Sequence, residues 1–195
     1  MDFMDDSALM ARVRKGRTES LAHLFDRHHG PLYGFFLRMT GQKALSEDLV
    51  QESFLRVLRF ASTFREGAPF RPWLYRIGRN VLADHWGRQR PEVDLEPLAG
   101  ILPAEGPCAH ARLEEAQDQD RLAQALARLP AEKRELLLLS RDPDMSGRDL
   151  AECFGCTPGA VKVRVHRALQ DLRSAFFGGP PTPADQDQTC MEVPS

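Results

Sequence analysis

Cysteine is scarce in this sequence, with four residues among 195: Cys108, Cys153, Cys156 and Cys190. Four irregularly spaced cysteines do not form a disulfide framework. Cys153 and Cys156 make a CxxC pair, but a structural zinc site needs a second pair of ligands at similar spacing, and the sequence has none. We therefore expect two small apolar residues packing around a turn, with no metal and no cofactor.

Long apolar runs are missing as well. No stretch approaches the ~20 apolar residues that span a bilayer, and residues 1–6 are acidic where a secretory signal would be basic and then apolar. We expect a cytoplasmic protein with no membrane contact of its own. Alternating strand patterns and internal repeats are also absent, which favours an all-α fold.

The net charge of -2 shows no large excess of either sign, but the charged residues are unevenly distributed along the chain. Residues 65–90 carry six arginines against two acids, and residues 158–173 carry four basic residues against one acid. Between them, residues 91–120 carry eight acids against one arginine. Two basic segments therefore flank an acidic one, a pattern that favours contact with nucleic acid at two places.

Helix signals divide residues 1–91 into four segments. Ser7, Thr18 and Ser46 are expected as N-caps, and the fourth helix is expected to begin near Arg71 and Pro72, because proline suits a first turn. In each segment apolar residues recur at helical spacing and predict a buried face. In the second helix this face is Leu21, Leu24, Phe25, Leu32, Phe35, Phe36 and Met39; in the third it is Leu49, Phe54, Val57 and Leu58.

The rest of the chain divides into three parts. Residues 92–117 have prolines, glycines and acids without periodicity, which is typical of a flexible linker. Residues 118–177 read as further helices, and the tail, residues 178–195, is expected to be disordered. The sequence thus predicts two small helical domains, an N-terminal helical bundle (residues 1–91) and a C-terminal helix-turn-helix domain, joined by a flexible acidic linker.

Residues 146–167 have the layout of a helix-turn-helix. Ser146 can cap a short helix, Gly155 can take the left-handed conformation of a sharp turn, and Thr157 can cap a longer helix. One face of this longer helix carries Val161, Val165, Ala168 and Leu172, and should be buried. The opposite face can enter a DNA major groove, and the alternative is a solvated basic face. Its residues are Gly159, Lys162, Val163, His166 and Arg167.

Two separate sets of residues resemble the bacterial RNA polymerase sigma factors, in particular their extracytoplasmic-function (ECF) branch. Residues 47–57 (EDLVQESFLRV) and 73–80 (WLYRIGRN) with Asp84 resemble the N-terminal domain of that family. Leu129-Pro130, residues 134–139 (RELLLL) and the helix-turn-helix resemble its promoter-binding C-terminal domain. The sequence departs mildly at Asp149, where the family usually has Glu, and at Ala160, where Thr is frequent.

The resemblance implies a transcription initiation factor that binds core RNA polymerase and promoter DNA, is controlled by an anti-sigma factor, and has no catalytic activity. It assigns the helix-turn-helix face to the minus-35 promoter element and the acidic linker to a basic channel of the polymerase. It assigns Asp48, Gln51, Glu52 and Arg56 to docking on core polymerase. It assigns Phe64, Arg65, Arg76, Arg79, Asn80, Arg88 and Arg90 to the minus-10 element, where exposed bases need aromatic or cationic surfaces.

Two alternatives are open at this point. A helix-turn-helix regulator with an N-terminal sensing domain would bind DNA without acting as a sigma subunit, and would not need the polar surface around Gln51. A helical metalloenzyme could use His23, His28 and His29. However, His28 and His29 are adjacent and point about 100° apart on a helix, and no set of acidic ligands accompanies them.

Overall fold

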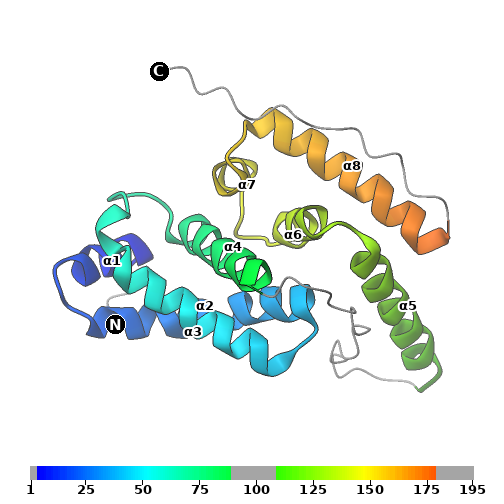
Figure 1. The fold of residues 1–195 in the computed structure, drawn as a ribbon, viewed down its shortest axis with the longest axis horizontal. Coiled ribbons are helices and arrows are strands. Elements are labelled where there is room, and N and C mark those ends of the chain that lie inside the picture. The colour runs from blue at the N-terminus through cyan, green and yellow to red at the C-terminus, as the bar shows by residue number, and fades with distance from the viewer. Residues whose placement is uncertain (1–3, 89–108, 179–195) are drawn as a thin grey trace. The chain divides into compact units, whose positions relative to one another are not determined.

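The computed structural model describes residues 4–88 and 109–178, and the chain forms two compact units, residues 1–100 and 101–195. The described residues form helices and no strands (Figure 1), which confirms the all-α class. No helix in these two ranges is long and apolar enough to cross a membrane. The elements are α1 (Asp6–Arg14), α2 (Glu19–Thr40), α3 (Lys43–Arg59), the 3-10 turn η1 (Ala61–Thr63), α4 (Phe70–Arg88), α5 (Ala109–Arg128), α6 (Ala131–Ser140), α7 (Gly147–Phe154) and α8 (Pro158–Phe177).

The first unit is built around α3, which packs against both α2 and α4, while α1 packs on α2. The apolar stripes seen in the sequence supply its core, and Leu32, Phe36 and Val57 are fully buried. Gly78 lets α4 come close to α2. A Cβ atom at this position would lie 3.2 Å from both Leu32 Cδ1 and Phe36 Cζ.

Two of the three expected caps of this unit are wrong. Asp5 caps α1 by accepting a 2.7 Å hydrogen bond from the Ala8 amide, while Ser7 Oγ accepts from the Gly67 amide at 3.0 Å. Helix α3 begins at Lys43, so Ser46 lies inside it, fully buried, and donates to the Gln42 carbonyl at 2.6 Å. Both serines make tertiary or intrahelical bonds that compete with capping.

Thr18 does occupy the N-cap position of α2, although its side chain makes no capping hydrogen bond. Leu58, expected in the core, is 37% exposed, because α3 turns that flank towards solvent near its C-terminal end. Helix α4 begins at Phe70, one residue before the Arg71-Pro72 start that the sequence indicates. The remaining apolar stripe residues, apart from the half-buried Leu21 and Phe25, are buried as expected.

The second unit is organised by α8, which packs against α5, α6 and α7. Leu129, Leu137 and Ala168 are buried together, and Leu126 and Leu172 pack against them. The buried Arg134 side chain closes the C-terminal end of α5 by donating to the backbone carbonyls of Leu126, Ala127 and Leu129. Burial lowers the pKa of this guanidinium, and the three carbonyl oxygens satisfy a charge that apolar packing alone would not.

The expected linker and tail lie largely outside the described residues, which omit 89–108 and 179–195. The exception is residues 109–117, which we assigned to the linker and which are helical backbone at the start of α5. This stretch contains three alanines together with leucine, arginine and glutamate, which are all good helix formers.

Candidate functional site

The turn before α8 is fixed by side-chain caps on both of its helices. Ser146 Oγ accepts from the Asp149 amide at 3.2 Å, and the Asp149 carboxylate accepts from the Ser146 amide at 2.8 Å, which completes a capping box. Gly155 ends α7 with φ +62°. Thr157 then caps α8 by accepting from the Ala160 amide at 3.2 Å. The aspartate that departs from the family pattern thus still serves the cap.

The structure places all five expected DNA-reading residues of α8 on its solvent face. Val163, which is apolar, is 51% exposed. On the other side of the helix, Val161 and Ala168 are buried. The full exposed set is Gly159, Lys162, Val163, His166 and Arg167. The described part of the second unit therefore presents a cationic helix face with one exposed apolar side chain, as major-groove contact requires.

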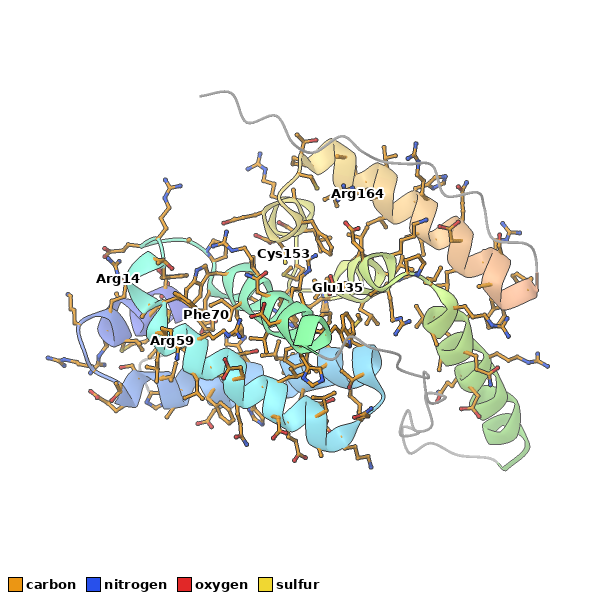
Figure 2. All side chains as sticks on the ribbon, viewed as in Figure 1. Arg14, Arg59, Phe70, Glu135, Cys153 and Arg164 are labelled. Carbon is orange, nitrogen blue, oxygen red and sulfur yellow. The ribbon has the colours of Figure 1, made fainter. Side chains whose placement is uncertain are left out.

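Two ion pairs hold α8 against α6. Lys133 Nζ on α6 lies 2.6 Å from the Asp171 carboxylate, and Arg164 Nη1 on α8 lies 3.4 Å from the Glu132 carboxylate. Figure 2 labels Arg164 on α8 and Glu135 on α6. These pairs sit on the side of α8 that faces the protein, so they orient the helix and leave its solvent face to a ligand.

The polar face of α3 carries Asp48, Gln51 and Glu52. Asp48 and Gln51 are exposed, and the Glu52 side chain is 44% exposed. Leu55 continues the same face towards the C-terminal end of the helix and is 61% exposed. Sequence reasoning missed Leu55 as a surface residue, although its three-residue step from Glu52 and seven-residue step from Asp48 place it on this face.

Arg56, the fourth expected docking residue, lies mostly beneath this face, with 16% of its side chain exposed. Its Nε donates to Glu52 Oε1 at 2.8 Å, and its Nη1 donates to Asp84 Oδ2 on α4 at 2.6 Å. The hydrogen bond to Glu52, followed by that to Asp84, raises the pKa of the guanidinium. Arg56 therefore connects α3 to α4 and is less available to a partner than its position suggested.

The residues expected at the minus-10 element divide into surface and core. Arg65, Arg76 and Asn80 are exposed, and Arg79 is half-buried. Phe64 is 2% exposed and packs edge-on against Trp73 at 5.2 Å between ring centroids, so its ring cannot stack on a base in this conformation. Trp73 is a core residue, 7% exposed. Arg88 is the last residue of α4, and Arg90 lies outside the described residues.

Two of the histidines of α2, His28 and His29, make contacts within the protein. His28 Nε2 lies 2.5 Å from Asp6 Oδ2, and His29 stacks on Phe25 at 4.8 Å. The hydrogen bond from His28, together with one from Arg27, lowers the pKa of Asp6 against the opposing effect of burial. Within residues 4–88 and 109–178, no three His, Cys, Asp or Glu side chains are arranged to hold a metal ion.

The two cysteines of the CxxC pair form no disulfide; Cys153 is buried in α7 and Cys156 is half-buried in the turn that follows. Figure 2 labels Cys153. Cys156 contributes its backbone amide to the helix end, donating to the Ala151 carbonyl at 2.9 Å. This placement fits the expectation of small residues packing around a turn.

An apolar groove between α5 and α8 is a feature that the sequence did not predict. Its volume is about 690 Å³, and three of its residues are exposed: Leu122, Leu169 and Phe177. Leu172, Phe176, Gln119 and Arg173 complete the lining. The sequence feature that could have indicated this groove is Leu169. It lies outside the buried stripe of α8, but three residues before Leu172 and so beside it on the helix surface.

Comparison with known proteins matches both units to one family. The model described as Sigma-70 region 2 matches residues 24–92, and that described as Sigma-70, region 4 matches residues 119–172. The chain is 33% identical over 165 residues to the RNA polymerase sigma factor CarQ of Myxococcus xanthus, covering 84% of this chain and 93% of CarQ. It is 32% identical over 171 residues to the ECF RNA polymerase sigma factor SigL of Mycobacterium tuberculosis, covering 84% and 94%.

Solved structures agree on the fold. The chain is similar to CnrH in complex with the cytosolic domain of CnrY, with a TM-score of 0.66, 27% identity, and coverage of 90% of this chain and 99% of that chain. It also shares its fold with the sigma factor RpoE bound to the anti-sigma factor NepR from Bartonella quintana, with a TM-score of 0.65, 23% identity, and coverage of 80% and 96%.

Proposed function

The chain belongs to the sigma-70 family, in its ECF branch, and we propose that its exposed surfaces divide the work of a sigma factor between the two units. As a sigma factor it binds core RNA polymerase and directs it to promoters. The observation that carries the division of work is that α3 and α8 each present an exposed polar face opposite a face that packs on the rest of the unit. Residues 1–91 would dock on polymerase and open the minus-10 element, and residues 118–177 would read the minus-35 element.

The polymerase-docking surface is Asp48, Gln51, Glu52 and Leu55 on α3. Three polar side chains beside one exposed leucine give a surface that can bury an apolar contact inside a polar rim, as protein interfaces commonly do. The two carboxylates favour a partner surface with cationic side chains. Arg56 belongs to this surface through its bond to Glu52.

The minus-10 surface is Arg65, Arg76, Arg79 and Asn80, with Arg88 and Arg90 continuing it along the chain. Guanidinium groups can stack on unpaired bases and neutralise phosphates, while the Asn80 amide can read a base edge. Phe64 is excluded from this surface as long as it stays packed on Trp73. The residues between 92 and 117 would connect the two DNA-binding units as a linker, and residues 178–195 would form a tail.

The minus-35 surface is the exposed face of α8. Lys162, His166 and Arg167 provide donors for phosphates and guanine edges, Val163 can contact a thymine methyl group, and Gly159 lets the backbone approach closely. None of these roles requires bond-making chemistry by this chain. The polymerase performs the catalysis, and a factor that works on it would act in the cytoplasm.

Control of the factor is proposed to use the groove between α5 and α8. The similar proteins CnrH and RpoE were solved in complex with the cytosolic domain of CnrY and with the anti-sigma factor NepR, respectively. A groove with exposed Leu122, Leu169 and Phe177 beside Arg173 fits one apolar face of a partner helix carrying an acidic side chain. We therefore expect an anti-sigma factor to bind the second unit there.

The docking surface can be tested by replacing Asp48, Gln51 and Glu52 together with alanine. Exposed substitutions cost little stability, so the variant should fold while its binding to core polymerase, measured by fluorescence anisotropy, is lost. The matched control replaces three exposed residues of α2, Glu19, His23 and Asp26, and should bind like the parent. Undiminished binding by a folded α3 variant would remove the proposed surface and mean that core polymerase binds another part of the chain.

A further inference from the structure

Asp84 stands out among the polar residues of α4. This helix carries Arg76, Arg79 and Asn80 of the proposed minus-10 surface, where an aspartate would repel phosphates. Asp84 accepts instead from Arg56 Nη1 at 2.6 Å, across a gap of 28 residues in the chain. Its role therefore lies towards α3, away from the nucleic acid.

Arg56 holds two carboxylates at once. Nε donates to Glu52 one turn earlier on α3, and Nη1 donates to Asp84 on α4. The side chain is 16% exposed, against 44% for Glu52 and 50% for Asp84, so the guanidinium lies under a surface whose acids are more open to solvent. This arrangement is a fixed fork, which a lysine could not reproduce.

The same residues line a cavity of about 230 Å³ between the two helices. Asp48, Glu52 and Arg56 line it from α3, and Val81, Asp84 and His85 line it from α4. The surface assigned to polymerase docking thus extends across the seam between α3 and α4.

We infer that Asp84 is a positioning residue for the polymerase-docking surface: by anchoring the Arg56 guanidinium from α4, it fixes the Glu52 carboxylate on α3 and preserves the acidic character of that face. A Glu52–Arg56 pair on one helix is weak and samples several rotamers. The second anchor removes that freedom before binding. Asp84 also offsets the charge of Arg56, which would otherwise cancel that of Glu52. This inference rests on the proposed docking surface.

The test measures binding of the full-length chain to core polymerase for Asp84→Asn, with Asp26→Asn on α2 as the matched control. Asp84→Asn should weaken binding about threefold or more, in line with coupling between residues that share one network. The separate variant Asp84→Glu, which keeps the carboxylate, should bind core polymerase within about twofold of the parent. Tryptophan fluorescence of the first unit, which contains both tryptophans, Trp73 and Trp86, checks folding.

A double-mutant cycle separates positioning from other effects. In an Arg56→Gln background, Asp84→Asn should cause no further loss, because the anchor has nothing left to hold. If Asp84→Asn proves unstable, Arg56→Lys provides the same test, since it keeps the charge but loses the fork and should also weaken binding. Parent-like binding by folded Asp84→Asn and Arg56→Lys, or equal losses in both backgrounds of the cycle, would overturn the inference.

The outcome is distinct from failure of the docking proposal itself. If the triple variant at Asp48, Gln51 and Glu52 loses polymerase binding while Asp84→Asn keeps it, the surface stands and the positioning role of Asp84 falls. If the triple variant keeps binding, the docking surface falls, and the inference falls with it.

Discussion

Lys133 and Asp171 form an ion pair at 2.6 Å that joins α6 to the helix carrying the proposed minus-35 surface. The Asp171 side chain is 11% exposed and that of Lys133 is 38% exposed. The carboxylate has little water to solvate its charge and needs the lysine for that, whereas the lysine is still partly solvated. A carboxylate left unpaired at such a position is costly. The orientation of α8, which carries the proposed minus-35 surface, is therefore tied to one residue of α6.

Lys133→Met should destabilise the second unit by about 1–2 kcal/mol, less than for a fully buried pair because the lysine is partly exposed. Circular dichroism reports unfolding of both units, whereas tryptophan fluorescence reports only the first, since Trp73 and Trp86 lie there. The substitution should lower the melting temperature measured by circular dichroism and leave the melting temperature measured by tryptophan fluorescence unchanged. The double variant Lys133→Met/Asp171→Asn should recover part of the loss, and an unaltered dichroism transition in the single variant would contradict this account.

Gly78→Val should destabilise the first unit by about 1–3 kcal/mol, because the added atoms overpack a site where a Cβ alone would lie 3.2 Å from Leu32 and Phe36. Gly87→Val in the same helix is the matched control, since nothing lies within 4 Å of a Cβ there. The melting temperature measured by tryptophan fluorescence should fall for Gly78→Val and stay close to that of the parent for Gly87→Val. Equal effects of the two substitutions would mean that helix propensity, and not packing, governs α4.

Asp6 should make the first unit sensitive to acid. Its hydrogen bond from His28, and that from Arg27, lower its pKa below the ordinary value of 3.8 when the chain is folded. The stability that it contributes is therefore complete above about pH 4 and is lost as the pH falls through the lowered pKa. Asp6→Asn should be less stable at pH 7 by about 0.5–1.5 kcal/mol and should lose less stability between pH 5 and pH 3 than the parent.

The measurement is the tryptophan melting temperature of both proteins across that pH range, taken as a difference so that other carboxylates cancel. Asp26→Asn, at an exposed position on α2, should follow the parent curve. Parallel curves for the parent and Asp6→Asn would show that the Asp6–His28 contact does not couple to folding.

Replacing Arg167 or Lys162 with alanine should weaken DNA binding in two different ways. If Arg167 makes a paired contact to guanine, its loss should cost about 1–3 kcal/mol and relax the preference at one base position. If Lys162 neutralises a phosphate, its loss should weaken binding to all sequences and reduce the salt dependence by about one unit. Holoenzyme binding to promoter duplexes recovered by in vitro selection, titrated at several salt concentrations, distinguishes the two. Parent-like behaviour of both variants would exclude α8 as the helix in the groove.

Much of the fold could be predicted because its signals are local. The caps at Ser146 and Thr157, the left-handed turn at Gly155 and the three- and four-residue apolar steps of α8 involve neighbours along the chain. They determine where α7 and α8 begin and end and which face of α8 is buried. The same periodicity placed Asp48 and Gln51 on the solvent side of α3.

Other features depend on contacts that residue type and spacing along one helix do not reveal. Ser7 binds the Gly67 amide, 60 residues away, while Asp5 caps the helix. Phe64 is covered by Trp73 and Phe70 once α4 packs back on its loop. Residue type suggested a cap at Ser7 and a base-stacking ring at Phe64, but contacts with other segments bind the Ser7 hydroxyl and bury the Phe64 ring.

The sequence by itself determined the all-α class, the helix-turn-helix and the two sets of motifs that identify the family, because helix periodicity and capping depend on residues within a few positions of one another. Only the tertiary structure decided that Arg56 lies under the polar face of α3, bonded to Asp84, and that Leu122 and Leu169 line one groove. Spacing along a helix gives the direction of a side chain. What that side chain meets depends on which other helix packs there.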